Sequence, residues 1–160
     1  MSVDEIVEAN QRFYRAFESL DLAQMEAVWA HEGQIICVHP GWPAQAGWDA
    51  VRESWEAIFQ HTDAIRFDVE DVRAEVAGDM AWVVCVERIR SRATSRASEG
   101  AVFATNVFRR APGNGAWKLV LHHGSAFVTA HLPAGASGGS SSSPASEGSG
   151  GDSGSGNLSN

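Results

Sequence analysis

The chain has 160 residues, which is enough for one domain of ordinary size or for one domain with an appendage. Hydrophobic residues make up 44% and charged residues 20%, as in a soluble globular protein, and no apolar run approaches the roughly 18 residues that a membrane-spanning helix needs. Twenty acidic side chains against twelve basic ones give a net charge of -8, which excludes a general attraction to phosphate. We therefore expect neither a nucleic-acid partner nor a membrane partner.

The first residues and the cysteines indicate the compartment. The sequence begins with an acidic stretch and lacks the basic and then apolar order of a signal peptide. Cys37 and Cys85 both lie inside apolar runs without cationic neighbours, which favours buried, reduced thiols over a disulfide or a catalytic thiolate. These features predict a cytoplasmic protein.

The composition changes sharply at residue 134. Of the 27 residues from there to the end, 8 are Gly and 10 are Ser, with one Leu and no aromatic residue. Such a segment cannot bury enough apolar surface to offset its backbone entropy. We therefore predict one folded domain over residues 1–133 and a disordered, flexible tail over residues 134–160.

Helical patterns occupy the first part of the domain. Ser2-x-x-Glu5 resembles a capping box, and a stripe of apolar residues follows it as far as Phe17. Asp21-x-x-Gln24 resembles a second capping box, and Asp49 is the expected N-cap of a third helix. Three helices are therefore expected before residue 61.

Strand patterns fill the rest of the domain. A short strand is expected over residues 34–39, where Pro40 ends it, and four more over residues 65–76, 80–90, 98–110 and 117–128. The short polar turns between the last four imply antiparallel neighbours. The expected class is α+β, with three N-terminal helices packed in a curved, mostly antiparallel sheet that leaves a pocket on its concave side.

The order of these elements and three segments resemble the SnoaL-like branch of the nuclear transport factor 2-like superfamily. The segments are FYRAFESLDLAQMEAVWAHE, CVHPGWPAQAGWDAVRESWEAIF and TNVFRRAPGNGAWKLVLHHGS. The resemblance implies a cone-shaped fold with an internal cleft and frequent homodimerisation through the outer face of the sheet. It implies no single activity, because isomerases, dehydratases, cyclases and non-catalytic modules share the fold.

Ketosteroid isomerase, a member of this superfamily, offers a comparison of roles. Its catalytic Asp precedes a Pro at the end of the first strand, a position that resembles His39 here. The position of its oxyanion-hole tyrosine corresponds to Phe13, and that of its second donor falls near Thr105 or Asn106. Since losing one such donor can cost ~3 kcal/mol, steroid isomerisation is not expected.

Two histidines are the candidate catalytic residues. His39 should lie where the cleft opens, and an imidazole can act as a general base or acid at neutral pH; a hydrogen-bonded rim residue is the alternative. His123 has the strand phase of Trp117 and Leu119 and lies in a His-x-Ser pattern that resembles the SnoaL-like branch. We therefore expect His123 in the cleft and His122 on the outer face, with a structural role for His123 equally open.

Five further residues are candidate ligand contacts. Tyr14 and Asn106 carry polar groups on otherwise apolar stretches, and Glu87 shares a strand face with apolar residues, so its carboxyl should be paired or raised in pKa. Core packing, a satisfied amide and an ion pair with an arginine are the respective alternatives. Trp42 could cover the pocket, with burial against the third helix as the alternative. Trp29, Trp55 and Trp82 are expected in the core, and Trp55 is also a candidate ligand contact.

No motif supports a metal ion or a cofactor. The histidines lack the offsets of a zinc site, and neither a G-x-G-x-x-G sequence nor a P-loop occurs. Two functions are consistent with the sequence. One is a cofactor-independent isomerase, dehydratase or cyclase that uses His39 on a small organic molecule; the other is a non-catalytic ligand-binding or dimerisation module.

Overall fold

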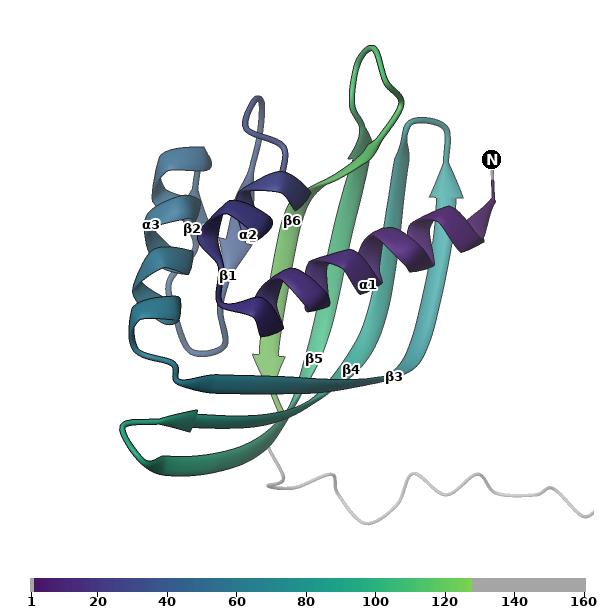
Figure 1. Cartoon of the computed structure of the whole chain (residues 1–160). Helices are drawn as coiled ribbons and strands as arrows, with labels where there is room; N and C mark the ends of the chain where they lie inside the picture. Colours follow the sequence, from purple (N-terminus) through teal and green to yellow (C-terminus); the bar gives the residue numbers. More distant parts are fainter. Residues whose placement is uncertain (1, 128–160) are drawn as a thin grey trace, which may run out of the picture. The chain divides into compact units, whose positions relative to one another are not determined.

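A computed structural model describes residues 2–127 of the chain (Figure 1). The last residues of the predicted domain and the whole predicted tail lie outside this range. No helix within residues 2–127 is both long enough and apolar enough to cross a bilayer.

Three helices form where the apolar periodicity predicts them. They are α1 (Val3–Ser19), α2 (Leu22–Val28) and α3 (Trp48–Gln60). Helix α1 ends because Leu20 adopts a left-handed conformation with φ of 53°, and its backbone N–H returns to the Phe17 carbonyl.

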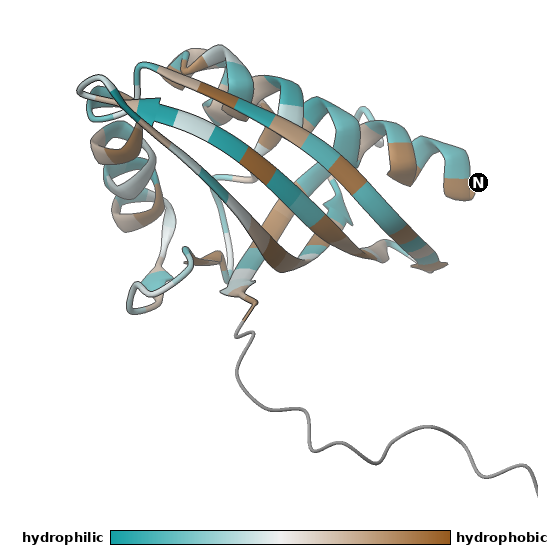
Figure 2. Cartoon of the chain, turned by 90° about the horizontal axis from the view of Figure 1, so that it is seen from below, coloured by the Kyte–Doolittle hydropathy of each residue, from teal (hydrophilic) through white to brown (hydrophobic). Residues whose placement is uncertain are grey.

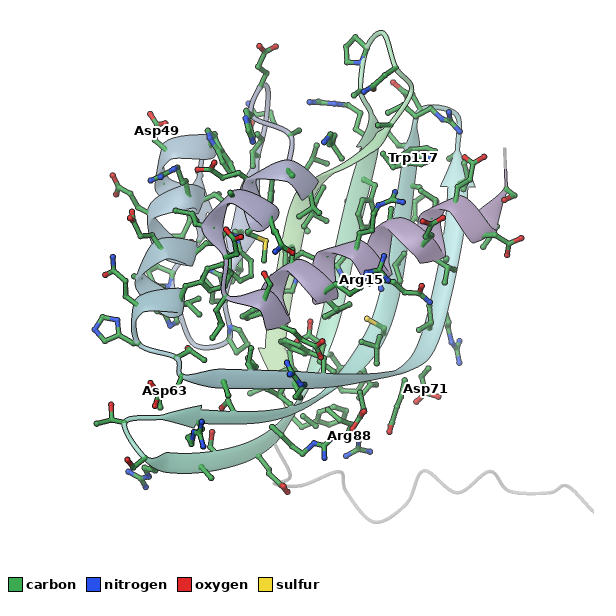
Figure 3. All side chains as sticks on the ribbon, in the orientation of Figure 1. Arg15, Asp49, Asp63, Asp71, Arg88 and Trp117 are labelled. Atoms are coloured by element: carbon green, nitrogen blue, oxygen red, sulfur yellow. The ribbon has the colours of Figure 1, made fainter. Side chains whose placement is uncertain are left out.

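The two predicted capping boxes have different outcomes. Asp21 caps α2 through a hydrogen bond from the Ala23 N–H to its side chain. The prediction for Ser2 is wrong, since its side chain makes no capping bond, and Glu5 instead accepts hydrogen bonds from Arg110 and the Trp117 indole. Helix α3 begins two residues earlier than predicted, because its N-cap is Gly47 and not Asp49, so Asp49 lies in its first turn (Figure 3).

Six strands form one sheet, and four of them are long. The strands are β1 (Ile36–Val38), β2 (Gln45–Ala46), β3 (Ala64–Ala77), β4 (Met80–Ala93), β5 (Arg96–Arg110) and β6 (Trp117–Ala126). The short β2 was not predicted, because a two-residue strand leaves no periodic signal. The predicted turn over residues 91–97 shrinks to Thr94 and Ser95, and β4 and β5 lengthen to meet it.

The strand order is β2-β1-β6-β5-β4-β3. All neighbours are antiparallel except β1 and β6, which run parallel. The long strands bend, so the sheet is concave toward α1, which crosses it diagonally, while α2 packs against β6 and α3 against β1 and β2 (Figure 1). Bands of opposite hydropathy alternate along these strands, as expected for a sheet with one buried face (Figure 2).

A bulge in β6 changes which side chains face the helices. Phe108 pairs with Leu119 and Val107 pairs with Leu121, so Val120 is an extra residue. Leu119 and Val120 are both buried, and the alternation is shifted by one residue from there to the end of the strand.

Aromatic side chains fill the centre of the concave side. Phe13, Trp29 and Trp55 are almost completely buried, and the Trp55 ring packs against Phe13 and Phe17. The expectation for Trp82 is wrong: its side chain is 38% exposed, because its strand phase directs it to the outer face.

Candidate functional site

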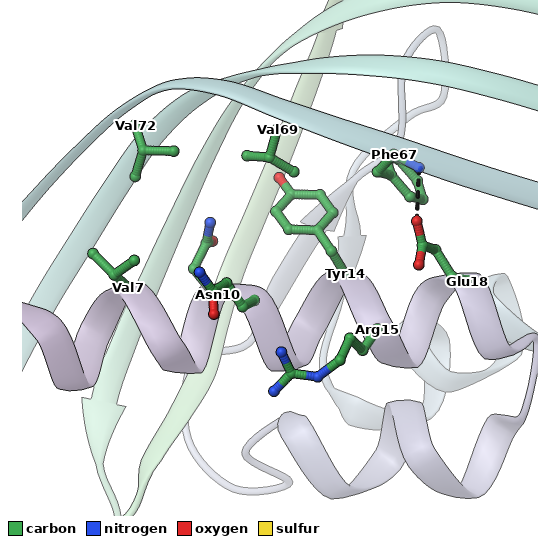
Figure 4. Close-up of a pocket in the computed structure, with 9 residues that line it drawn as sticks. Val7, Asn10, Tyr14, Arg15, Glu18, Phe67, Val69 and Val72 are labelled. Carbon is green, nitrogen blue, oxygen red and sulfur yellow. Dashed lines mark hydrogen bonds between the residues drawn. The ribbon is translucent and has the colours of Figure 1, made fainter.

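A cavity of about 290 Å³ lies between α1 and β3 (Figure 4). Its apolar lining comprises Val7, Phe67, Val69 and Val72. Asn10 and Tyr14 are the polar side chains of α1 that enter it from the buried side of the helix. Glu18 bridges the two elements at the other end, where its carboxylate accepts a hydrogen bond of 2.8 Å from the Phe67 N–H.

Tyr14 connects this cavity to a buried carboxyl group. Its hydroxyl donates a 2.7 Å hydrogen bond to Oε1 of Glu87, which lies on the concave face of β4 and is 2% exposed. None of the ion pairs within residues 2–127 joins an arginine to Glu87. The arginine ion pair, which was the alternative expectation for Glu87, therefore does not form among these residues. A second contact of the hydroxyl, at 3.3 Å, is with the Cys85 thiol.

The environment of Glu87 shifts its acidity. Burial raises the pKa of the Glu87 carboxyl to about 7, although the Tyr14 hydrogen bond opposes the shift by stabilising the carboxylate. Burial and the nearby Glu87 charge raise the pKa of Tyr14 well above its usual range. At neutral pH, Glu87 therefore exists in both protonation states beside a neutral tyrosine.

Asn106 and His122 continue this network across the sheet. The Asn106 side-chain NH₂ donates to Asn10 Oδ1 at 2.7 Å and to the Tyr14 hydroxyl at 3.3 Å. Its Oδ1 lies 2.6 Å from Nδ1 of His122, the residue opposite it on β6. All five side chains of this network, Asn10, Tyr14, Glu87, Asn106 and His122, are buried.

His123 lies on the opposite face from the one predicted. It is exposed on the outer face, whereas His122 is 2% exposed in the interior. The Val120 bulge is the reason, because counting alternate residues from Trp117 across an inserted residue exchanges the two faces. His123 is therefore not part of the interior network.

His39 follows β1 directly and is buried. Its Nε2 lies 2.9 Å from the Ser54 hydroxyl, which itself donates to the Val51 carbonyl, so the imidazole is the donor to Ser54. Burial lowers the pKa of His39 to about 4, which leaves the ring neutral at pH 7. His39 lines neither the α1–β3 cavity nor any of three further pockets among residues 2–127.

Two tryptophans enclose the His39 ring. Trp55 packs edge-on against it at 4.7 Å between ring centroids, and Trp42 does so at 5.2 Å. Trp42 is 42% exposed and covers His39, whereas Trp55 is completely buried. Neither lines the α1–β3 cavity, so the structure brings together Tyr14, Glu87 and Asn106 as one group and His39, Trp42 and Trp55 as another.

The sequence interpretation missed His122 and Asn10 as members of the site. Asn10 interrupts the apolar stripe of α1, and this polar gap was a signal for an inward-facing amide. His122 gave no comparable signal, because only the strand register reveals the bulge that turns it inward.

Comparisons with known proteins identify the family to which this chain belongs. The sequence model of the SnoaL-like domain matches residues 6–129. The chain therefore belongs to the SnoaL-like family, within the nuclear transport factor 2-like superfamily that the sequence resembled.

Two solved structures are similar over most of their lengths. One is a candidate dehydratase of the NTF2-like family from Streptomyces avermitilis, with 38% identity, a TM-score of 0.73, and coverage of 79% of this chain and 96% of that one. The other is a candidate association domain of calcium/calmodulin-dependent protein kinase type II from Thiobacillus denitrificans, with 32% identity, a TM-score of 0.66, and coverage of 75% and 93%.

A curated relative is the F-box protein SKIP8 of Arabidopsis thaliana, which is 28% identical over 123 residues. The match includes 77% of this chain, and the chain spans about half the length of that relative.

Proposed function

We propose that the α1–β3 cavity binds a small, uncharged organic molecule and that Tyr14 and Glu87 supply acid–base catalysis of a dehydratase or isomerase type, without a cofactor. One observation carries this proposal: the Tyr14 hydroxyl that lines the cavity is also bonded at 2.7 Å to a buried carboxyl group. The candidate dehydratase at 38% identity supports the same reaction class.

The pair has the properties of a proton relay. A pKa of about 7 makes Glu87 an effective acid and base at neutral pH. Protonated Glu87 can pass its proton to the Tyr14 oxygen while Tyr14 passes its own proton to an oxygen of the ligand. In a dehydration of a β-hydroxyketone, that oxygen leaves as water, a base removes the proton from the neighbouring carbon, and the C=C bond of an enone forms.

His39 is not assigned as the base for a ligand in this cavity. It lines no part of the α1–β3 cavity, Trp42 and Trp55 enclose its ring, and its pKa of about 4 would make it a weak base at pH 7. The base is the same relay with Glu87 ionised: the carboxylate takes the Tyr14 hydroxyl proton while the Tyr14 oxygen takes the proton from carbon, and the relay then returns a proton to the leaving oxygen.

A substrate panel tests the proposal. Small cyclic and aromatic β-hydroxyketones and their enones are added to the full chain, with binding followed by melting temperature and turnover by enone absorbance. We expect a compound that raises the melting temperature. Tyr14→Phe and Glu87→Gln should each lower its turnover by about 100-fold or more, as for loss of a general acid–base group.

His123→Asn is the matched control, since it changes an exposed histidine on the other face of β6. It should leave binding and turnover unchanged. If panel compounds bind but none of them is turned over, the result would favour a non-catalytic ligand-binding protein. Full turnover by both Tyr14→Phe and Glu87→Gln would contradict the assigned roles.

A second candidate function is assembly through the outer face of the sheet. Four large apolar side chains are 38–49% exposed there or at its end, namely Trp82, Val84, Phe103 and Phe127. The Phe103 and Phe127 rings contact each other at 4.0 Å between centroids. Such a patch is typical of a protein interface, and the 32% identical relative is a candidate association domain.

Sedimentation equilibrium tests this assembly. We expect the full chain to form a homodimer and Phe103→Asp to shift it toward the monomer. Val3→Asp is the control, because Val3 is equally exposed (46%) but lies at the start of α1. A wild-type chain that stays monomeric at all concentrations would contradict the proposal.

A further inference from the structure

His122 contacts the interior network at one end only. Its ring packs 5.0 Å from Phe13 and 6.1 Å from Trp55 between centroids, and it is not part of the cavity lining. Its polar contact is the short Nδ1 to Oδ1 hydrogen bond with Asn106. Whatever His122 does to a bound ligand must therefore act through Asn106.

The protonation of His122 gives this hydrogen bond a direction. Burial lowers the pKa of His122 to about 3, so the ring is neutral and carries one N–H. A carbonyl oxygen can only accept, which places that hydrogen on Nδ1. The amide of Asn106 is then fixed with its oxygen toward His122 and its NH₂ toward Asn10 and Tyr14.

The orientation of Asn106 determines where the Tyr14 hydrogen points. The Tyr14 oxygen accepts from the Asn106 NH₂, so its own hydrogen is directed to Glu87. In the reversed amide, the Asn106 oxygen would face Tyr14 and compete with Glu87 for that hydrogen. Every donor from His122 to Glu87 therefore points the same way.

We propose that His122 is a positioning residue that, through Asn106, directs the Tyr14 hydroxyl hydrogen to Glu87 and so sets the proton position beside the cavity. The catalytic meaning of this role rests on the function proposed above, but the hydrogen-bond direction does not.

Two thiols and one imidazole near the network are uncharged; they lie on β4, on β1 and directly after β1. Cys85 on β4 contacts the Tyr14 hydroxyl, and Cys37 on β1 is close enough for the Glu87 charge to affect it. Burial raises the pKa of both thiols. His39 lies 6.5 Å from His122 between ring centroids, and burial lowers its pKa. None of them supplies a fixed charge that could impose the same direction.

The titration of Glu87 in the full chain without ligand tests the proposal. The carboxyl is followed by NMR with ¹³C-labelled glutamate and assigned by its absence in Glu87→Gln. His122→Phe removes the donor, so Glu87 should lose part of the Tyr14 bond and its midpoint should rise by about one pH unit. His122→Asn, which keeps an N–H near the same place, should restore the wild-type midpoint.

The neighbouring histidine provides the control. His123→Phe alters the outer face and should leave the Glu87 midpoint unchanged. A folded His122→Phe variant with an unchanged midpoint would overturn the proposal, and so would an equal shift in His123→Phe. The ¹⁵N shifts of the wild-type ring give a test without any variant: an Nδ1–H tautomer of His122 supports the proposal and an Nε2–H tautomer overturns it.

These readouts are separate from those of the proposed function. A midpoint shift without turnover of any panel compound would leave the positioning role intact and contradict the enzyme. Turnover of a panel compound together with an unchanged Glu87 midpoint in His122→Phe would support the enzymatic function and contradict the positioning role.

Discussion

Glu87 illustrates how one position on a strand acquires unusual chemistry. Its phase on β4 places the carboxyl in the interior, and its hydrogen bond comes from a tyrosine more than seventy residues earlier in the chain. The strand period alone predicted that this carboxyl would be paired or raised in pKa. The partner was not predictable, because nothing in the sequence relates the rotation of α1 to the register of β4.

Gly124 is a second position where a neighbour distant in sequence decides the outcome. A Cβ atom there would lie 3.0 Å from Cγ of Pro40 and 3.1 Å from Cγ1 of Val102. We expect Gly124→Ala to lower the free energy of unfolding by ~1–3 kcal/mol, because the proline ring cannot move without displacing the backbone beside His39. Denaturant unfolding measures the difference.

Gly100→Ala is the matched control for that experiment. Gly100 also lies in a long strand, but a Cβ atom there would meet nothing within 4 Å. The substitution should leave stability unchanged or raise it slightly, since alanine has less backbone entropy to lose. Equal losses in both variants would mean that crowding at Pro40 is not the cause.

Among the elements, β6 shows why strand periodicity has limits. The alternation of buried residues was correct up to Leu119 and wrong from Val120 onward. A bulge adds one residue without changing composition or hydropathy, so the sequence carries no mark of it. The consequence was an exchange of His122 and His123, and with it an incorrect candidate for the cleft.

The helix starts give a test at the same scale. Asp21→Ala removes a side chain that accepts from the Ala23 N–H, so we expect a loss of ~1 kcal/mol in the free energy of unfolding. Ser2→Ala should have almost no effect, because the Ser2 side chain makes no capping bond. Chemical denaturation of both variants measures this, and an equal loss in the two would contradict the assignment of the caps.

At the scale of the whole molecule, three buried groups give opposing dependences of stability on pH. The pKa values of His39 and His122 are lowered from 6.5, so their stabilisation is present above pH 6.5 and is lost as the pH falls through their folded values. The pKa of Glu87 is raised from 4.5 to about 7, so its contribution is present below pH 4.5 and is lost as the pH rises to 7.

Between pH 6.5 and 4.5 the histidines dominate. There the unfolded chain binds two more protons at the histidines, and the folded chain binds one more at Glu87. The net difference of one proton corresponds to ~1.4 kcal/mol per pH unit. These groups should therefore lower the free energy of unfolding by ~3 kcal/mol as the pH falls from 6.5 to 4.5. Unfolding by denaturant at several pH values measures the slope.

Glu87→Gln separates the two contributions. The amide oxygen can still accept a hydrogen bond from Tyr14, but the side chain no longer titrates. The proton uptake at Glu87 that opposes the effect of the histidines is therefore lost. We expect the loss of stability between pH 6.5 and 4.5 to become about twice as large as in the wild type. A slope that is unchanged by the substitution would show that Glu87 does not titrate in this range.

The sequence by itself determined the local structure: three helices, four long strands, their order and the family. These follow from periodicity and turn chemistry, which act over a few residues and are written in consecutive positions. The interior positions of Glu87 and Asn106 were equally predictable.

Only the tertiary structure decided which polar groups meet. The pairing of Tyr14 with Glu87, the inward turn of His122 and the covering of His39 by Trp42 depend on strand register, a bulge and the angle at which α1 crosses the sheet. Those quantities result from packing the whole core at once, because each contact joins residues whose separation along the chain leaves no local pattern.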